Sequence, residues 1–321
     1  MFPEYFRNLA RALPTNSMNN PKDQEMPVIT PEQEHVISRS EIESLIYLLE
    51  DPDPVVQEHV NGRLRHLGDK AIPILDELSG KTENEASRDH IQGIIRRITS
   101  SSIEHEFVSL IENGVETLEE LERGIFILSR LERPTIDEAH YRTRLDQMAE
   151  SLKAKLELTT SVPVHQIVAR HIFEREDFKG DTNEYFNPSN SYIHRVMERR
   201  KGIPISLAMV VLFVARRVNL HFEGINMPMH FLLKFSGSSG TIYLDPYNNG
   251  EEVSLDQCAY FLKKNGIQPN KNHFEPAAPS EMLARTLRNL INSYEKRDDQ
   301  ENANQHKRLL GLLEASRQHV K

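Results

Sequence analysis

The chain has 321 residues, of which 38% are hydrophobic and 27% are charged, so it is long enough for two or three domains with hydrophobic cores. Its net charge of −9 argues against nucleic acid as the main partner, because such binding needs a basic face. A single cysteine excludes a disulfide framework and predicts a reducing, cytoplasmic environment. The longest unbroken apolar run, residues 208–215, is well short of the ~20 residues that span a bilayer, so no transmembrane segment is expected.

Residues 1–36 divide into a short amphipathic helix and a linker. Five apolar side chains near the start fall on one helical face: Phe2, Tyr5, Phe6, Leu9 and Leu13. We expect this helix to dock on the protein's own body, with a partner or membrane anchor as the alternative. Residues 14–36 are rich in Pro, Asn, Gln and Glu, which predicts disorder.

Residues 37–105 carry the pattern of four helices. Ser40 begins the first, and the Asp-Pro repeat at 51–54 ends it and starts the second, which stops at Gly68. The third covers residues 71–78, and isoleucines at helical spacing around residues 91–98 mark the fourth. A helix, an Asp-Pro turn, a second helix and a Gly resemble a HEAT-type unit. The alternative is an ordinary helical subdomain.

Helices continue through residues 118–131, 141–156 and the segment after Pro163. Residues 40–175 are therefore predicted to be almost entirely helical, with the sheet confined to about residues 220–256. A helix at 193–199 ends at Lys201–Gly202, and Pro204 opens the next one. Because residues 205–214 are apolar on every face, that helix should be the most buried.

Two strand-like segments follow, Met229–Phe235 and Thr241–Asp245, joined by a Gly/Ser loop. An antiparallel hairpin would set His230 and Asp245 side by side, facing the N-terminus of the Pro204 helix. Such an Asp can orient an imidazole, as in a catalytic triad. The alternative is structural, with His230 as a buried hydrogen-bonding residue and Asp245 as a turn former before Pro246.

The nucleophile is the weak point of this arrangement. A helix N-terminus lowers the pKa of a thiol and stabilises an oxyanion, but the Pro204 helix begins without a cysteine. Ser206 is the only nucleophile there, and a hydroxyl gains less from this position than a thiol. The sole cysteine, Cys258, lies after Asp245 in an apparent helix, outside this arrangement. The 14 His show no convincing metal-ligand spacing, and no cofactor is expected.

The order and spacing of several motifs resemble the SirB-type branch of the transglutaminase-like superfamily over about residues 107–315. The matching positions are Phe178, Gly180, Asp181, Tyr185, Asn190, Ser191, Glu198–Leu207, Gly224, Asn226, Pro228, His230–Leu232, Asp245–Tyr247 and, near the end, Leu283, Arg285, Leu287, Asn289 and Leu290.

This resemblance implies an α+β fold: mostly helical, with a papain-like core and a small antiparallel sheet. His230 and Asp245 match the catalytic His and Asp of the superfamily. The Cys position falls near Pro204–Ser206 and is not filled, and Met229 replaces the small Gly usual before the His. The candidate binding residues that follow from the matching positions are Gly180, Asp181, Tyr185, Asn190, Arg200 and Asn226.

The segment 273–321 carries two apolar-striped helices and resembles one tetratricopeptide-like unit. A single unit cannot bury its own faces, so it should pack on the core. With the regions above, this divides the chain at 1–36, 37–105, 106–272 and 273–321, with the transglutaminase-like core in the third.

Two functions compete. The first is a non-catalytic interaction or regulatory protein that binds a protein partner. The alternative is a hydrolase or acyl transferase of amidase or peptidase type that uses Ser206, His230 and Asp245. Catalysis would require the Ser206 hydroxyl within about 2.6–3.2 Å of His230 in an open cleft. The sequence leaves the partner, any substrate and the oligomeric state open.

Overall fold

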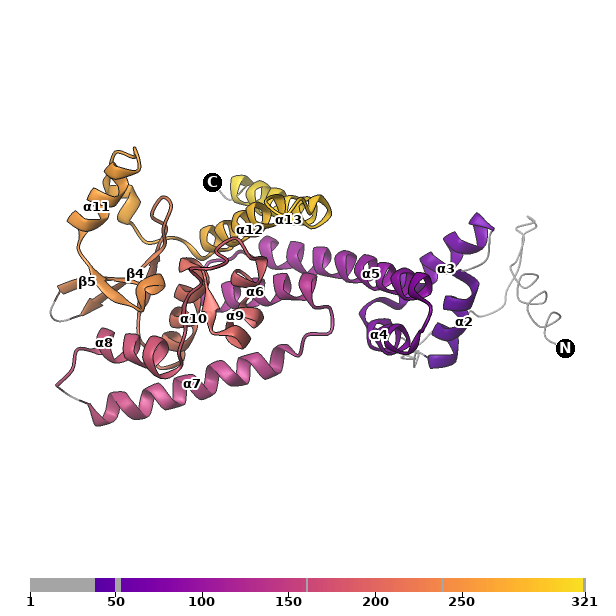
Figure 1. Cartoon of the computed structure of the whole chain (residues 1–321), viewed down its shortest axis with the longest axis horizontal. Helices are drawn as coiled ribbons and strands as arrows, with labels where there is room; N and C mark the ends of the chain where they lie inside the picture. The colour runs from indigo at the N-terminus through magenta and orange to yellow at the C-terminus, as the bar shows by residue number, and fades with distance from the viewer. Residues whose placement is uncertain (1–37, 50–52, 160, 238–239, 320–321) are drawn as a thin grey trace, which may run out of the picture. The chain divides into compact units, whose positions relative to one another are not determined.

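A computed structural model describes residues 38–49, 53–159, 161–237 and 240–319. These residues are mostly helical and carry one small antiparallel sheet, as the sequence predicted (Figure 1). The predicted N-terminal helix and linker, residues 1–36, lie outside the described residues.

The first helices surround a hydrophobic cluster of their own. They are α2 (Arg39–Leu49), α3 (Pro54–Leu67), the 3₁₀ turn η1 (Gly68–Ala71) and α4 (Ile72–Lys81). Asp53 caps α3 by accepting a hydrogen bond of 2.9 Å from the Val55 backbone, and Pro54 occupies the first turn. The cluster is built from Ile42, Val60, Leu64, Leu67, Ala71, Ile72, Leu75, Ile91, Ile94, Ile95 and Ile98. The HEAT-type assignment stays a prediction.

Helix α5 (Glu85–Glu112) is longer than the sequence pattern indicated. Its 28 residues run through the position between 105 and 106 where a boundary was predicted. Residues 91–98 contribute to the first cluster, and Ile103, Phe107 and Leu110 contribute to a second, larger one. The helix continues because no Pro or Gly interrupts it after Gly93.

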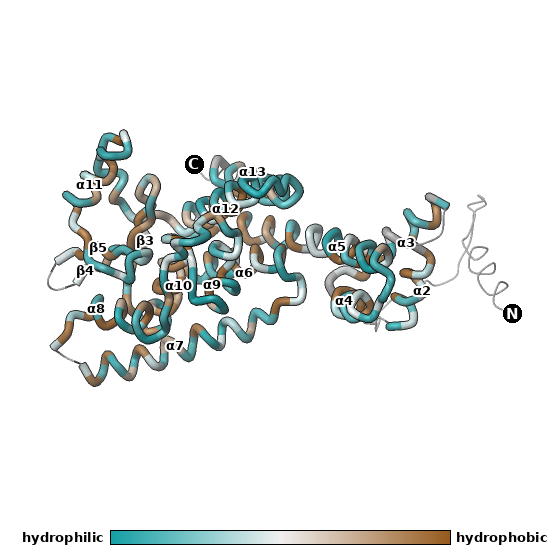
Figure 2. Tube along the Cα trace, viewed as in Figure 1, coloured by the Kyte–Doolittle hydropathy of each residue, from teal (hydrophilic) through white to brown (hydrophobic). Residues whose placement is uncertain are grey.

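The larger cluster is centred on α10. Around it lie α6 (Leu118–Glu132), α7 (Glu138–Leu158), α8 (Val164–Ala169) with its π-helical continuation η2 (Arg170–Arg175), and α9 (Ile193–Arg199). Every residue of α10 (Pro204–Arg217) from Pro204 to Ala215 is buried, as expected from its apolar sequence. Figure 2 shows the concentration of hydrophobic residues on α10.

The sheet contains the predicted hairpin and two strands that were not predicted. Its order is β3 (Phe222–Ile225), β4 (Leu232–Gly237), β5 (Gly240–Asp245) and β6 (Glu251–Val253), all antiparallel. The prediction that all strands fall within residues 220–256 is wrong in one respect: β1 (Lys179–Gly180) and β2 (Lys201–Gly202) form a short parallel pair outside it. A strand of two residues is too short to show the alternation of apolar and polar side chains by which strands are predicted. No strand occurs in the described part of 40–175, which agrees with the prediction.

The C-terminal part consists of α11 (Leu255–Lys264), α12 (Pro279–Glu295) and α13 (Gln300–His319), and α12 and α13 lie side by side (Figure 1). The hydroxyl of Tyr192 lies 3.0 Å from the Tyr294 hydroxyl and 3.0 Å from Nε2 of His306. The predicted packing of the two tail helices on the core is therefore observed. Their tetratricopeptide-like character stays a prediction.

Candidate functional site

His230 and Asp245 form the centre of the candidate site. Nε2 of His230 lies 2.9 Å from Oδ2 of Asp245. Asp245 is the last residue of β5, whereas His230 lies in the turn before β4, where its backbone N–H donates to the Met227 carbonyl at 3.1 Å. The two side chains meet as predicted, but His230 precedes the strand rather than beginning it, because pairing starts only at Leu232.

Asp245 is fixed by several donors besides His230. Its Oδ1 accepts from the backbone of Tyr247 at 2.9 Å, and its Oδ2 accepts from the Asn248 amide at 2.7 Å. Burial raises the pKa of Asp245, but the hydrogen bond and charge of His230, followed by these donors, outweigh burial and leave the pKa below its ordinary value. The carboxylate is therefore ionised and held in one orientation.

The imidazole of His230 keeps one nitrogen for a ligand. A carboxylate only accepts hydrogen bonds, so Nε2 carries the proton that faces Asp245. Nδ1 forms no hydrogen bond with any described residue, and 17% of the side chain is exposed. This nitrogen can accept a hydrogen bond, or donate one when the ring is protonated.

Ser206 does not join this pair. Its side chain is fully buried, and its hydroxyl donates to the carbonyl oxygen of Asn190 at 2.6 Å and accepts from the Ile203 backbone at 3.0 Å. A Cβ on Gly202 would lie 2.6 Å from this hydroxyl, so the backbone closes over it. Ser206 therefore ties the start of α10 to the preceding loop.

Cys258 lies closer to the pair than the sequence suggested. It is buried on α11, one turn from Phe261, whose ring centroid is 6.1 Å from that of His230. Burial, and next the charge of Asp245, raise the pKa of the Cys258 thiol. The thiol is therefore protonated at neutral pH, opposite to what a nucleophile requires.

Four of the candidate binding residues are engaged in contacts within the chain. Oδ2 of Asp181 accepts from Arg199 at 2.9 Å, and the Asn190 amide donates to the Glu184 carbonyl at 2.7 Å. Arg200 bonds Glu176 at 2.7 and 2.9 Å, and a Cβ on Gly180 would lie 2.7 Å from the ring of Tyr247. These contacts give all four a structural explanation.

The other two candidates, Tyr185 and Asn226, lead to Arg285, which the sequence analysis named in the family match but not as a site residue. The ring of Tyr185 is 5.8 Å from that of Tyr247, and the Asn226 amide oxygen accepts from Nη1 of Arg285. The same Nη1 donates to the Met227 carbonyl at 2.9 Å. Arg285 belongs to the C-terminal motif around Leu283–Leu290. That motif was the only sequence feature that could have indicated a role for Arg285 in the site.

Exposed hydrophobic side chains extend outward from the pair: Met229 precedes His230 and the Phe261 ring lies 6.1 Å from it, while the rings of Tyr185 and Phe186 continue from Tyr247 at 5.8 and 5.2 Å. We call Tyr185, Phe186, Met229 and Phe261 the site surface. Met229 is 58% exposed and has a φ of 65°, a left-handed conformation that favours glycine. A large apolar side chain is thus held outward next to His230.

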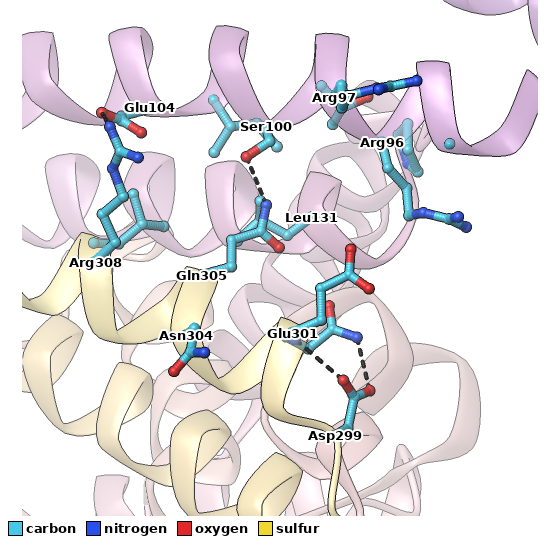
Figure 3. Close-up of a pocket in the computed structure, with 16 residues that line it drawn as sticks. Arg96, Arg97, Ser100, Glu104, Leu131, Asp299, Glu301, Asn304, Gln305 and Arg308 are labelled. Atoms are coloured by element: carbon cyan, nitrogen blue, oxygen red, sulfur yellow. Dashed lines mark hydrogen bonds and ion pairs between the residues drawn. The ribbon is translucent and has the colours of Figure 1, made fainter. Parts of the chain in front are cut away.

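A hollow of about 830 Å³ lies elsewhere, between α5 and α13 (Figure 3). Figure 3 shows Gln305 donating to Ser100 across it, at 2.9 Å, beside the Arg308–Glu104 ion pair. It contains none of the candidate site residues. Among the described residues, no group of three His, Cys, Asp or Glu side chains could hold a metal ion. No described helix combines the length and hydrophobicity needed to cross a membrane.

Residues 139–288 match the transglutaminase-like superfamily, over the segment that contains His230, Asp245 and Arg285. The chain contains a transglutaminase-like domain. It is 31% identical over 179 residues to a UPF0162 protein of Xylella fastidiosa, which covers 54% of this chain and 64% of that protein. A UPF0162 protein of Vibrio cholerae is 40% identical over 86 residues, 26% of this chain and 32% of that protein.

The chain is also similar to part of F-box only protein 21 of Mus musculus, at 35% identity over 99 residues, 28% of this chain and 16% of that protein. The chain thus spans less than two thirds of the length of these relatives. No solved structure matches it.

Proposed function

We propose that this protein is a non-catalytic interaction or regulatory protein of the cytoplasm, in which a transglutaminase-like domain of the SirB type binds a protein partner at the site surface. HEAT-like helices before the domain and a tetratricopeptide-like pair after it would complete the binding body.

The observation that carries this proposal is the state of the nucleophiles. The hydroxyl of Ser206 is buried and bonded to Asn190, and the thiol of Cys258 is buried with a raised pKa. No hydrogen bond joins either group to His230 within the described residues. A His–Asp pair forms an acyl-enzyme of the superfamily's type only with an activated Ser or Cys beside the imidazole.

The site surface supports binding rather than turnover. Aromatic and Met side chains are enriched in protein interfaces, and exposed groups of them mark interaction sites. Met229 stays exposed in an unfavourable backbone conformation, which indicates that its outward position serves contact with another molecule. The similarity to a small part of F-box only protein 21 fits a module used within larger proteins.

The alternative, a hydrolase or acyl transferase that uses Ser206, His230 and Asp245, is favoured by the His230–Asp245 pair alone. It would require Ser206 to leave its bonds to Asn190 and Ile203 and turn toward the imidazole.

Covalent labelling separates the two functions. The full chain is treated with a fluorophosphonate and with iodoacetamide, and adducts are mapped by mass spectrometry. We expect no adduct at Ser206 in the folded protein, and alkylation of Cys258 only after unfolding. An adduct at Ser206 that disappears in His230→Ala would establish the enzyme instead.

Partner binding is tested with matched baits in lysate of the source organism. Wild type, Ser206→Ala, Tyr185→Ala and Tyr47→Ala are compared by quantitative proteomics. Tyr47 is 79% exposed on α2 and serves as the control for loss of a surface tyrosine. A partner retained by wild type, Ser206→Ala and Tyr47→Ala but lost by Tyr185→Ala supports the proposal, and equal retention by all four baits contradicts it.

A further inference from the structure

Arg285 connects the tail to the turn that carries His230. Its Nη1 donates to the Met227 carbonyl, the same oxygen that accepts the His230 backbone N–H at 3.1 Å. Nε and Nη2 of Arg285 form no hydrogen bond with a described residue, yet neither is a buried atom closed off from solvent. One edge of the guanidinium thus supports the turn, and the other remains available.

The charge of Arg285 lacks a counter-ion within the described part of the chain. No carboxylate of a described residue forms an ion pair with it; its acceptors are an amide oxygen and a backbone carbonyl. Burial lowers the pKa of Arg285, and of the charged groups nearby, Tyr185 opposes this shift and Arg288 adds to it. By contrast, Arg288, three residues further on α12, pairs with Glu314 at 2.6 Å. A half-buried cation without an anion is costly unless a ligand supplies one.

Tyr185 supplies a second donor at the same place. Each of Tyr185 and Arg285 lies near enough for its charge to shift the pKa of the other, and the Tyr185 hydroxyl has no hydrogen-bond partner among the described residues. Its ring packs against Tyr247, next to the His230–Asp245 pair. We propose that Arg285, together with the Tyr185 hydroxyl, binds a carboxylate group that a ligand presents beside His230.

A carboxylate fits this site better than a phosphate. The free edge of a guanidinium offers two parallel N–H donors, which match the two oxygens of a carboxylate. A phosphate carries more charge and is generally held by several cations or backbone N–H groups, whereas Arg285 is a single cation. The inference deepens the proposed function and rests on it for the source of the carboxylate, which is an acidic side chain or the C-terminus of a partner.

The test is a titration of the full chain, observed through the side-chain Nε–Hε NMR signals of the arginines. Acetate is the probe, and acetamide is the uncharged control. We expect a saturable shift of the Arg285 signal with acetate and none with acetamide. Tyr185→Phe, which removes only the hydroxyl, should weaken acetate binding about tenfold, since hydrogen bonds to charged groups are strong.

Two arginine variants complete the design. Arg285→Gln should abolish the saturable effect on neighbouring backbone signals. Arg288→Gln removes the same charge from the same helix, where it is paired, and should leave acetate affinity unchanged. An Arg285 signal that does not respond to acetate, or that responds equally to acetamide, overturns the inference, as does unchanged binding in Tyr185→Phe and Arg285→Gln.

N-acetylglycine and N-acetylglutamate α-amide then distinguish a C-terminal carboxylate from a side-chain carboxylate. The outcome is also separable from the proposed function. A partner lost by the Tyr185→Ala bait but kept by an Arg285→Gln bait would leave partner binding in place and remove the carboxylate site. Acetate binding to a chain that captures no partner would keep the carboxylate site and contradict the proposed partner binding.

Discussion

Glu122 and Arg285 are both charged side chains drawn into the protein, but their surroundings are opposite. Glu122 is fully buried in α6, and three arginines neutralise it: Arg142 at 2.8 Å, Arg217 at 2.7 Å and Arg216 at 3.1 Å. Burial raises the pKa of Glu122, but these neighbours, Arg217 first, outweigh it and lower the pKa. Among the residues that the structure describes, Arg285 meets only neutral acceptors.

The difference distinguishes a charge that stabilises the fold, Glu122, from a charge that we propose binds a ligand, Arg285. A buried ion is tolerated when its partners come from the same chain, and the cluster around Glu122 joins α6, α7 and α10 in this way. An ion without such partners is a feature of binding sites, where stability is given up for function. The two regions should therefore respond in opposite ways to loss of charge.

The largest effect is expected for Glu122→Gln. Removing the carboxylate leaves three arginines facing one another, so the free energy of unfolding should fall by about 3–5 kcal/mol. Urea denaturation at neutral pH measures this loss. The matched control is Glu119→Gln, because the Glu119 side chain is 79% exposed and pairs with Arg216 at a longer distance of 3.4 Å. If Glu122→Gln lost no more stability than the control, Glu122 would not be the structural charge that we contrast with Arg285.

The junction between core and tail provides a pH-dependent test. His306 is fully buried, and burial lowers its pKa from 6.5 to about 4. Its Nδ1 lies 2.7 Å from the Asn302 carbonyl, which only accepts, so Nε2 accepts from Tyr192 and the ring is neutral.

The unfolded state therefore takes up this proton before the folded state does. Stability from His306 is complete above pH 6.5 and is lost as the pH falls toward 4, by on the order of 3 kcal/mol. Burial also lowers the pKa of His171, which adds a loss of the same sign. Unfolding free energies at several pH values should give a shallower slope for His306→Gln than for wild type. An identical slope would show that His306 does not carry the effect.

Ser206→Ala should have a moderate effect on stability and none on partner binding. The change removes the bonds of the hydroxyl to the Ile203 N–H and the Asn190 carbonyl. These two groups keep only the longer bond of 3.4 Å to each other, so the loss costs about 1–3 kcal/mol. Thermal unfolding measures the loss, and binding is assayed well below the melting temperature. Loss of binding in a folded Ser206→Ala protein would give the hydroxyl a functional role and contradict our assignment.

The smallest effect on stability is expected for Arg285→Gln. Because the guanidinium has no counter-ion, loss of its charge removes a desolvation cost while it also removes the support of the Met227 carbonyl. The unfolding free energy should change by less than about 1 kcal/mol, in either direction. A loss as large as that of Glu122→Gln would mean that Arg285 is a structural residue.

The sequence predicted features that depend on local pattern. The helical region before residue 175, the buried α10 and the meeting of His230 with Asp245 all follow from periodicity or from hairpin geometry. The structure contains each of them. The sheet was predicted only in part, because β3 and β6 are short and β1 and β2 have two residues each.

Features that depend on distant neighbours could not be predicted. The sequence offered Ser206 as a nucleophile, and only the structure places its hydroxyl against Asn190, 16 residues earlier. Arg285 lies 59 residues from Asn226, and whether it has a counter-ion is a property of packing, not of any motif. The candidate binding residues were chosen from motif order alone. They therefore included four residues with structural contacts as well as Tyr185 and Asn226, the two neighbours of Arg285.

Helix α5 has a consequence for how the protein unfolds. Its 28 residues, about 40 Å of helix, belong to both hydrophobic clusters, with Thr99-Ser-Ser-Ser102 between the two sets of apolar contacts. Hydroxyl side chains compete for backbone hydrogen bonds and are weak helix formers, so this stretch is where the helix opens most easily. Gln305 and Arg308 of α13 hold it at Ser100 and Glu104. We therefore expect these bonds from α13 to couple the two clusters, so that without them the clusters would lose their structure in two steps rather than one.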